Sequence, residues 1–286
     1  MGDLILTLPV LDEIRSSLPE SFIEVWGIQP QAGLIQSVDR VDRLDALEVA
    51  PLFVAEPIPP VLQGRLREFD LAISFLGDPG GVVAKNLASA GVRRVITGCP
   101  AKRPTIHAVY QLASVLEPLG LNLRDPVPKL TIVRSQNEKP LLGFHPGSGS
   151  RAKNWPLECW NDFLRRIGPK FERLLLIGGE ADDEVVHAMQ LSWKGPGFET
   201  AIRRNLWELA QMLGRCSIFV GHDTGVTHLA AAVQTPTVAL FGPTSPDVWR
   251  PLGEHVKIIQ GEGGRMDAIA AATVLSVVKA LTRTWG

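Results

Sequence analysis

The chain has 286 residues, which is too many for one small core and suits two domains of ordinary size. Its composition, 45% hydrophobic and 21% charged, is typical of a soluble globular protein, and a net charge of −1 gives no electrostatic footprint for nucleic acid. No apolar run approaches the roughly 20 residues that span a bilayer, and the first residues lack the basic start of a secretory signal, so we expect a cytoplasmic protein.

Short apolar runs that end in glycine or a polar loop alternate with helical patterns along almost the whole chain. This alternation predicts an α/β fold, with parallel sheets covered by helices on both faces. Strands are expected at residues 23–26, 71–75, 95–97, 141–145, 174–177, 217–220 and 237–241. Helices are expected at residues 106–116, 157–167, 183–193, 206–213 and 267–284.

Residues 125–140 interrupt this alternation with prolines and polar side chains, so we place a linker there. The predicted domains are residues 1–130 and residues 131–286, which face each other across a cleft. Ligands in such folds bind outside the carboxyl ends of the strands. The last predicted helix is rich in alanine on one side and could pack back on the N-terminal domain.

The most informative turn lies between the apolar run 217–220 and the helical pattern that starts at Val226. The first N–H groups of such a helix lack internal partners and can bind an anion such as a diphosphate. Asp223, Thr224 and His228 add polar groups at this point. Asp223 and Thr224 could instead be helix N-caps, and a lone histidine here is more often structural than a ligand, so the turn by itself leaves both interpretations open.

A second loop with similar properties follows the apolar run 141–145. It passes through small residues that let the backbone approach a ligand, offers Lys153, and enters a helix at Pro156. Neither G-x-x-x-x-G-K-[ST] nor G-x-G-x-x-G occurs, so nucleoside triphosphate hydrolysis and a dinucleotide fingerprint are not supported. Cys99, Cys159 and Cys216 are far apart and show no C-x-x-C spacing, which argues against a disulfide framework and a zinc site.

Together the two loops resemble a known family. The C-terminal motifs that carry the resemblance are His145-Pro-Gly-Ser-Gly149, Lys153, Trp155-Pro156, Glu158, Gly221, Asp223-Thr-Gly225, His228-Leu-Ala-Ala-Ala232, Phe241-Gly-Pro-Thr244 and Trp249. The N-terminal ones are Gly2-Asp-Leu-Ile-Leu-Thr-Leu-Pro9 and Asp70-Leu-Ala-Ile-Ser-Phe-Leu76. This pattern resembles glycosyltransferase family 9, the heptosyltransferases that build lipopolysaccharide core, and it implies a GT-B fold of two Rossmann-like domains.

The resemblance also implies site residues. A nucleotide-activated heptose would bind mainly to the C-terminal domain, and no metal or other cofactor would be required. The donor-binding residues expected from the family pattern are Ser148, Gly149 and Lys153 on the diphosphate, and Asp223, Thr224, Gly225 and His228 around the diphosphate and sugar. An acidic residue would contact the nucleoside; we take Asp183, although Glu180, Asp182 and Glu184 remain open and a solvated helix start would explain most of them.

Asp3 matches the Gly-Asp pair of the family and would be the base that deprotonates the acceptor hydroxyl, with Lys153 as its catalytic counterpart on the leaving group. Related chains normally carry a strand and a glycine-containing loop ahead of that pair. We therefore expect an N-terminal sheet that lacks its first strand, with Asp3 on a frayed terminus or a start assigned too late. By propensity residues 4–8 could be a strand, but the resemblance makes them the opening of a helix, and we follow the resemblance.

The leading interpretation is an inverting glycosyltransferase that moves heptose from an ADP-heptose-like donor to a lipopolysaccharide-core or related glycan acceptor. The acceptor lipid would bring the enzyme to the inner face of the cytoplasmic membrane, with peripheral contact only. Basic pairs that could meet acceptor phosphates, or could be solvated surface charge, are Lys85, Arg93, Arg94, Lys102 and Arg103. The alternatives are a sugar-nucleotide epimerase with the same fold and a nucleotide-sugar-binding pseudoenzyme.

Overall fold

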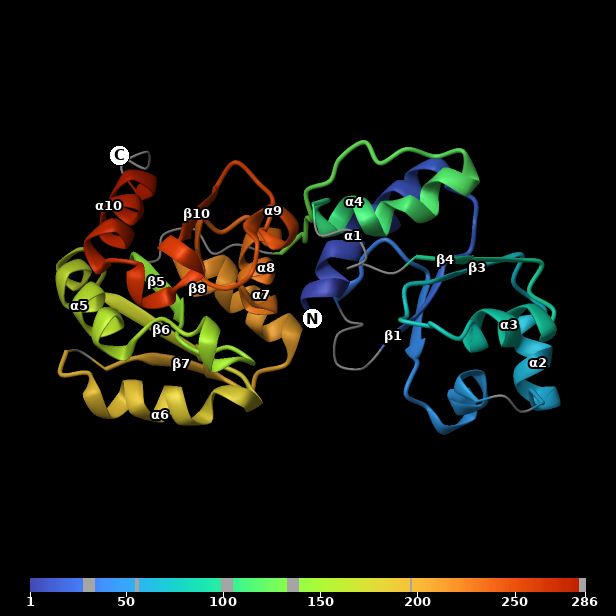
Figure 1. The fold of residues 1–286 in the computed structure, drawn as a ribbon, viewed down its shortest axis with the longest axis horizontal. Helices are drawn as coiled ribbons and strands as arrows, with labels where there is room; N and C mark the ends of the chain where they lie inside the picture. Colours follow the sequence, from blue (N-terminus) through green and yellow to red (C-terminus); the bar gives the residue numbers. More distant parts are fainter. Residues whose placement is uncertain (28–33, 55–56, 99–104, 133–138, 196, 283–286) are drawn as a thin grey trace. The chain divides into compact units, whose positions relative to one another are not determined.

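The fold is that of a computed structural model, which describes residues 1–27, 34–54, 57–98, 105–132, 139–195 and 197–282 (Figure 1). The chain divides into two compact units. The N-terminal unit comprises Leu6–Pro126, and the C-terminal unit comprises Met1–Ile5 together with Val127–Gly286. Among the described residues, no helix is long and apolar enough to cross a bilayer.

The C-terminal unit is built on a six-stranded parallel sheet with strand order β10-β9-β8-β5-β6-β7. Its strands are β5 (Leu141–His145), β6 (Arg173–Gly178), β7 (Glu199–Ile202), β8 (Ile218–His222), β9 (Thr237–Phe241) and β10 (Val256–Gln260). Every residue of β5, β8 and β9 is buried. These strands read as unbroken apolar runs because helices cover both faces of a parallel sheet.

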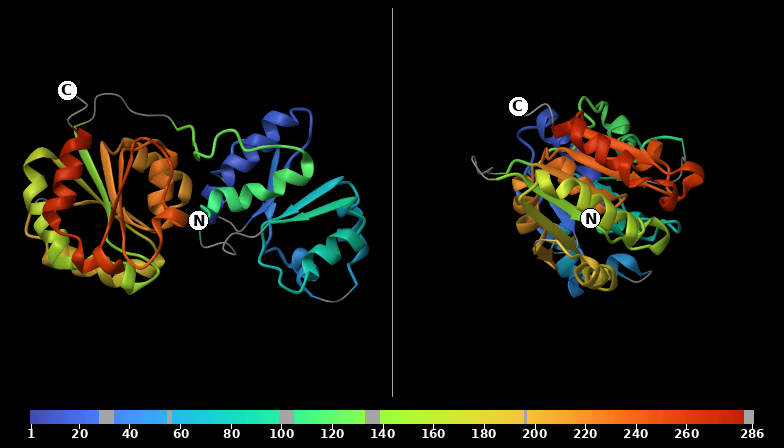
Figure 2. Two further views of the ribbon diagram at one scale, coloured as in Figure 1. Left: turned by 45° about the horizontal axis from the view of Figure 1, so that its top comes forward. Right: turned by 90° about the vertical axis from the view of Figure 1, so that its left-hand side faces the viewer.

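Helices lie on both sides of this sheet, as Figure 2 shows. They are α5 (Leu157–Ile167), α6 (Asp183–Ser192), α7 (Leu206–Arg215), α8 (Gly225–Ala232), the short α9 (Pro246–Trp249) and α10 (Ala271–Thr282). Helix α10 starts four residues later than expected, because Met266–Ala268 form a separate 3-10 turn. It packs against α5 within the same unit; its return to the N-terminal domain stays a prediction.

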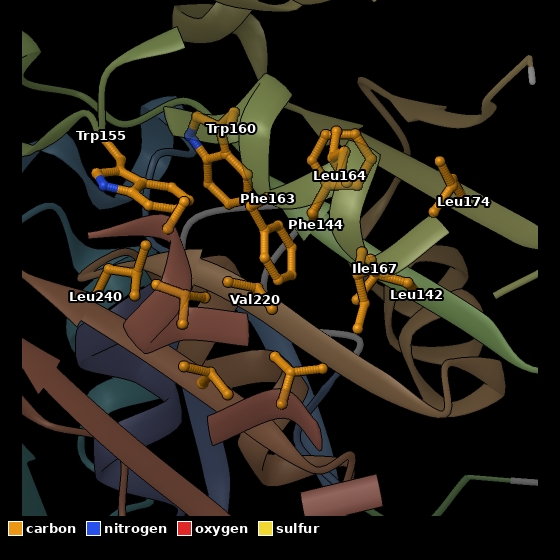
Figure 3. Packing of buried hydrophobic residues seen from close by; sticks show 14 of the residues in the cluster. Leu142, Phe144, Trp155, Trp160, Phe163, Leu164, Ile167, Leu174, Val220 and Leu240 are labelled. Carbon is orange, nitrogen blue, oxygen red and sulfur yellow. The ribbon is translucent and has the colours of Figure 1, made fainter. Parts of the chain in front are cut away.

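The core of the C-terminal unit is aromatic where α5 meets the sheet (Figure 3). Trp160 of α5 is fully buried, and its ring centroid lies 5.0 Å from that of Trp155 and 5.6 Å from that of Phe144 on β5. Tilted and edge-on aromatic pairs at such distances are favourable beyond the area that they bury. Trp155 therefore ties the loop after β5 to the core.

The N-terminal unit has two separate parallel pairs of strands rather than one sheet among its described residues. Strands β1 (Glu24–Gly27) and β2 (Arg40–Arg43) form one pair, and β3 (Leu71–Ser74) and β4 (Arg94–Thr97) form the other. The helices are α1 (Gly2–Ser17), α2 (Pro60–Leu66), α3 (Val82–Ser89) and α4 (Ala108–Ala113), with 3-10 segments η2 (Leu47–Phe53) and η3 (Ser114–Leu119). An N-terminal sheet interrupted at a missing strand was the expectation, and two pairs are what the described residues form.

Two local expectations have informative outcomes. Residues 4–8 are helical, as the resemblance implied and against their strand propensity, because α1 buries Ile5, Leu6 and Leu8. The expected helix 106–116 is instead α4 followed by the 3-10 segment η3, which contains Pro118.

The predicted linker is partly bound to the C-terminal unit. The backbone N–H of Leu130 donates to the carbonyl of Ala232 at 2.9 Å, and Leu130 is only 5% exposed. The Ile132 side chain lies so close to Gly214 of α7 that a Cβ at position 214 would collide with it. The linker residues 133–138 lie outside the described residues.

Candidate functional site

The predicted site residues of the C-terminal unit lie in loops that follow neighbouring strands of the sheet. Strand β5 pairs with β8 on one side and with β6 on the other, and all three are parallel. The carboxyl ends of parallel neighbours meet at the same edge, so the loops that follow them converge. These loops carry Lys153 after β5, the acidic run after β6 and Asp223 after β8.

Lys153 and Asp223 form an ion pair across two of these loops. The Lys153 Nζ atom lies 2.8 Å from Oδ2 of Asp223, and the two side chains are 28% and 10% exposed. The ammonium group is therefore held in place, while part of the Lys153 side chain still reaches solvent. A positive charge fixed in this way can bind an incoming phosphate at little cost in side-chain entropy.

The N-terminus of α8 opens beside this pair. Thr224 occupies the N-cap position with an extended backbone, but its side chain makes no capping hydrogen bond. The first internal bonds of the turn run from the N–H groups of Thr227 and His228 to the Thr224 carbonyl. The N–H groups of Gly225 and Val226 come before them and are donors that an α-helix leaves for an external acceptor.

Gly225 lies at a close backbone approach. A Cβ at this position would lie 2.8 Å from Met1 Cβ and 2.9 Å from the Gly2 nitrogen, both in the C-terminal unit, so no side chain fits without movement. His228 is 5% exposed, and a Cβ on Gly2 would approach its ring to 3.7 Å. Asp3, the predicted base, is exposed in the first turn of α1, next to that contact.

Ser148 organises its own loop. Its hydroxyl lies 2.6 Å from the Ser150 carbonyl and 2.7 Å from Oδ1 of Asn154, and it accepts a hydrogen bond from the Ser150 N–H. A hydroxyl has one proton, so these acceptors already use its donor capacity. Gly149 differs, because a Cβ there would meet no described atom within 4 Å, which leaves open space above the loop.

The four acidic residues after β6 have different environments. Asp182 is buried, and its Oδ2 accepts from His145 at 2.9 Å and from the Gly179 N–H at 2.7 Å. Burial opposes its ionisation, but these hydrogen bonds and the His145 charge outweigh burial and hold the pKa of Asp182 below its ordinary value. Asp183 forms an exposed ion pair with Arg203, Glu184 bonds Arg151 at 2.6 Å, and Glu180 is exposed.

Two histidines were missed as site residues at the sequence level. His145 ends β5, and its Nδ1 lies 3.3 Å from the Thr224 hydroxyl while its Nε2 bonds Asp182. His222 ends β8 and is completely buried. The available signal was a polar residue at the last position of each buried apolar strand, directly before the loops that carry Lys153 and Asp223.

Two of the five basic residues suggested for acceptor phosphates, Arg93 and Arg94, have local partners. Arg93 forms an ion pair with Asp70 at 2.8 Å, and Arg94 donates to the Pro118 carbonyl. Lys102 and Arg103 lie outside the described residues, as does Cys99. Among the residues that the structure describes, no group of three or more His, Cys, Asp or Glu side chains could hold a metal ion.

Known proteins with similar sequences include lipopolysaccharide heptosyltransferases. Residues 100–275 match the family described as Glycosyltransferase family 9 (heptosyltransferase). Lipopolysaccharide heptosyltransferase 1 of Salmonella typhimurium (strain LT2) is 33% identical over 285 residues, which cover 89% of each chain. Lipopolysaccharide heptosyltransferase 2 of the same organism is 30% identical over 129 residues, and this match spans only 37% of that protein and 43% of this chain.

Solved structures agree on the fold. The glycosyl transferase family 9 protein from Veillonella parvula DSM 2008 superposes with a TM-score of 0.80 at 20% identity and covers 98% of this chain and 93% of its own. The E. coli heptosyltransferase WaaC with ADP superposes with a TM-score of 0.75 at 19% identity, with coverage of 98% and 96%. These likenesses confirm the expected GT-B fold. With a family match over more than half of its length and a relative aligned along nearly all of it, the chain belongs to glycosyltransferase family 9.

Proposed function

We propose that this protein is an inverting, metal-independent glycosyltransferase that moves heptose from an ADP-heptose-like donor to a lipopolysaccharide-core or related glycan acceptor. The observation that carries the proposal is the Lys153–Asp223 pair, 2.8 Å apart, beside the N-terminus of α8, whose N-cap side chain makes no capping hydrogen bond. A partly exposed ammonium and backbone N–H donors at one point form an anion site for a diphosphate. The relatives named above include a heptosyltransferase crystallised with ADP.

In this proposal the donor diphosphate lies over the loop at Ser148 and Gly149 and accepts from the first N–H groups of α8. Lys153 keeps its bond to Asp223, donates from its other N–H groups to the phosphate oxygens, and stabilises the charge that builds on the leaving diphosphate. Asp223, Thr224, Gly225 and His228 surround the diphosphate and sugar. Asp183 contacts the nucleoside after release from Arg203. Exposed Glu180, and Glu184 after release from Arg151, are the other exposed acids available for that role.

Asp3 is the proposed base. An acceptor hydroxyl oxygen attacks the anomeric carbon as the bond from that carbon to the diphosphate oxygen breaks; Asp3 takes the hydroxyl proton, and the bonding electrons leave with the diphosphate. The nucleophile and the leaving group lie in line, so the anomeric configuration inverts.

The acceptor and the cellular place are further parts of the proposal. The names of the relatives refer to lipopolysaccharide and lipooligosaccharide. A lipid-linked acceptor of this kind would bring a cytoplasmic enzyme to the inner face of the cytoplasmic membrane, where it makes peripheral contact without insertion.

Calorimetric titration of the full chain with ADP-heptose, with UDP-glucose and NAD as comparison ligands, tests the donor. We expect selective binding of ADP-heptose. Lys153→Ala and Asp223→Ala should abolish transfer while the fold is retained. Lys139→Ala is the matched control, because it removes another lysine paired with an acid, Glu172, at an exposed position. Unchanged turnover in both site variants would exclude this site.

The same assay separates the alternatives. Conversion of the sugar nucleotide without acceptor would indicate an epimerase. Binding of ADP-heptose without turnover, at saturating acceptor, would indicate a nucleotide-sugar-binding protein that lacks activity.

A further inference from the structure

His222 makes two side-chain hydrogen bonds to the two ends of the loop that carries Lys153. Its Nδ1 lies 3.2 Å from the Gly147 carbonyl, and its Nε2 lies 2.9 Å from the Trp155 backbone nitrogen. The side chain is completely buried, and its ring packs edge-on against Trp160 with the centroids 5.6 Å apart. One ring therefore spans the loop from its first turn to its last residue.

These partners fix the protonation state of His222. A carbonyl only accepts, so Nδ1 must carry the proton; a backbone N–H only donates, so Nε2 must be bare. Only a neutral imidazole with the proton on Nδ1 makes both bonds. Burial is the main reason that the pKa of His222 falls to about 3, so the ring stays neutral in the range where enzymes work.

The backbone of His222 contacts the start of α8, which is the other part of the proposed site. Its carbonyl accepts a hydrogen bond from the Thr227 hydroxyl in the first turn of α8. The two residues that follow His222 are Asp223, the partner of Lys153, and Thr224, the N-cap of α8. His222 thus contacts the Lys153 loop through its side chain and the start of α8 through its main chain.

We propose that His222 is a positioning residue for the donor diphosphate: it holds the loop at residues 147–155 against the start of α8, so that Lys153 and the α8 N–H groups face one anion. This inference rests on the proposed function for its ligand. Because its side chain is completely buried, His222 acts through the loop and is assigned no contact with the ligand.

The other hydrogen bonds of the loop explain why this link matters. Ser148, Ser150 and Asn154 bond to one another inside the loop and give it shape. The Arg151–Glu184 pair, which connects the loop to α6, is 86% and 82% exposed and so contributes little. The Trp155 Nε1 atom also donates to the Ile269 carbonyl, and Lys153 bonds Asp223, but each of these bonds anchors one point of the loop. The His222 side chain bonds both ends of the loop from β8, and its loss removes these partners from a buried carbonyl and a buried N–H.

Amide substitutions can remove the two bonds one at a time. The asparagine amide ends at the level of the ring δ atoms, so His222→Asn can still donate to the Gly147 carbonyl. The glutamine amide ends at the level of the ε atoms, so His222→Gln can still accept from the Trp155 N–H. His222→Ala loses both. The matched control is Thr235→Val, because Thr235 is equally buried and donates to the Leu213 carbonyl before β9 begins, at the opposite edge of the sheet.

The test combines ADP titration with hydrogen exchange of peptides that cover residues 146–156, both on the full chain. We expect the Asn and Gln variants to bind ADP about tenfold more weakly than wild type, the Ala variant to bind more weakly still, and the loop to exchange faster in all three. Thr235→Val should lower the melting temperature to a similar extent without changing either readout. Folded His222 variants that bind ADP within about twofold of wild type would overturn the proposal.

Failure of the proposed function is distinguishable from failure of this inference. A wild-type chain that does not bind ADP contradicts the donor assignment, and loop exchange then decides the positioning role: faster exchange in the variants supports it, and unchanged exchange overturns it. Where no variant folds, nitrogen NMR of the wild-type imidazole decides. A proton on Nδ1 with a bare Nε2 supports the link, and a proton on Nε2 overturns it.

Discussion

Both units of the molecule contain parallel strands, but the strands form one continuous sheet in the C-terminal unit and two separate pairs in the N-terminal unit. In the C-terminal unit, six parallel strands form one sheet, and every residue of β5, β8 and β9 is buried. In the N-terminal unit, parallel strands form two separate pairs, and all four residues of β1 are only half-buried. Parallel strands are stable when both faces are covered, so the continuous sheet is the rigid platform on which loops can be placed accurately. The candidate donor site lies on that platform.

Truncation of one strand residue in each unit should expose this difference most strongly. Leu176→Ala removes a fully buried side chain from the middle of β6 and should destabilise the C-terminal unit by about 3–5 kcal/mol. Ile73→Ala on half-buried β3 should cost about 1–2 kcal/mol. Hydrogen exchange of peptides from each unit measures the two losses separately. Equal losses would contradict a difference in rigidity.

The next largest effect is the response of the C-terminal unit to acid. The pKa of His222 is about 3 in the fold and 6.5 ordinarily. Between these pH values the unfolded chain binds a proton at His222 and the folded chain does not. The stabilisation is complete above pH 6.5 and is lost as the pH falls; between pH 7 and pH 5 this residue alone should cost about 2 kcal/mol. Opening free energies from exchange at the two pH values measure it. His222→Asn should lack this part of the loss.

An ion pair of the N-terminal unit, Glu13–Arg124, should respond to acid at lower pH than His222. A hydrogen bond from Arg124 outweighs burial and lowers the pKa of Glu13, which is 7% exposed. A carboxyl with a lowered pKa stabilises the fold above its ordinary value of 4.5 and loses that effect as the pH falls through the folded value. The Glu13–Arg124 pair should therefore keep its effect from pH 7 to pH 5, so Arg124→Met should reduce the stability of the N-terminal unit by a similar amount at both pH values, measured by hydrogen exchange. An effect of Arg124→Met that disappears by pH 5 would contradict this order.

The smallest expected effect concerns an exposed contact on the C-terminal platform. The Arg151–Glu184 pair reaches the same loop as His222 but is almost fully in solvent. Arg151→Ala should change the stability of the unit by no more than about 0.5 kcal/mol. Thermal unfolding of this variant beside His222→Asn compares an exposed link with a buried one. If Arg151→Ala lost more stability than His222→Asn, the stabilisation from such a link would not depend on its burial.

Strand predictability followed the composition of each strand rather than the division into units. Strands β1, β3 and β4 of the N-terminal unit and β5, β6, β8 and β9 of the C-terminal unit could be predicted because each is a short apolar run. Strands β2, β7 and β10 were missed: β2 has charged residues at three of four positions, and β7 and β10 lie at the two edges of the sheet, where one side needs no apolar cover. Edge strands carry polar residues that periodicity does not distinguish from loops.

The site was predictable only as far as it depends on single loops. Lys153 and Asp223 could be chosen because each follows a buried strand, and the structure pairs them. The roles of His145, Asp182 and His222 depend on which strands are neighbours, and the order in the sheet is not the order in the chain. Asp182 shows the consequence: in sequence it is one of four equivalent acids, and in the fold it is the one buried against His145.

The first part of the linker packs on the C-terminal unit, and this decides where a C-terminal fragment of the protein should begin. Residues 127–132 follow the last predicted helix of the N-terminal region in sequence, yet the Leu130 N–H bonds the Ala232 carbonyl and Ile132 covers Gly214. A C-terminal fragment that begins at β5 would uncover this apolar seam on α7 and α8 and invite self-association. A fragment that begins at Val127 would carry its own cover, so the best place to divide this protein lies near the start of the predicted linker 125–140, before Val127.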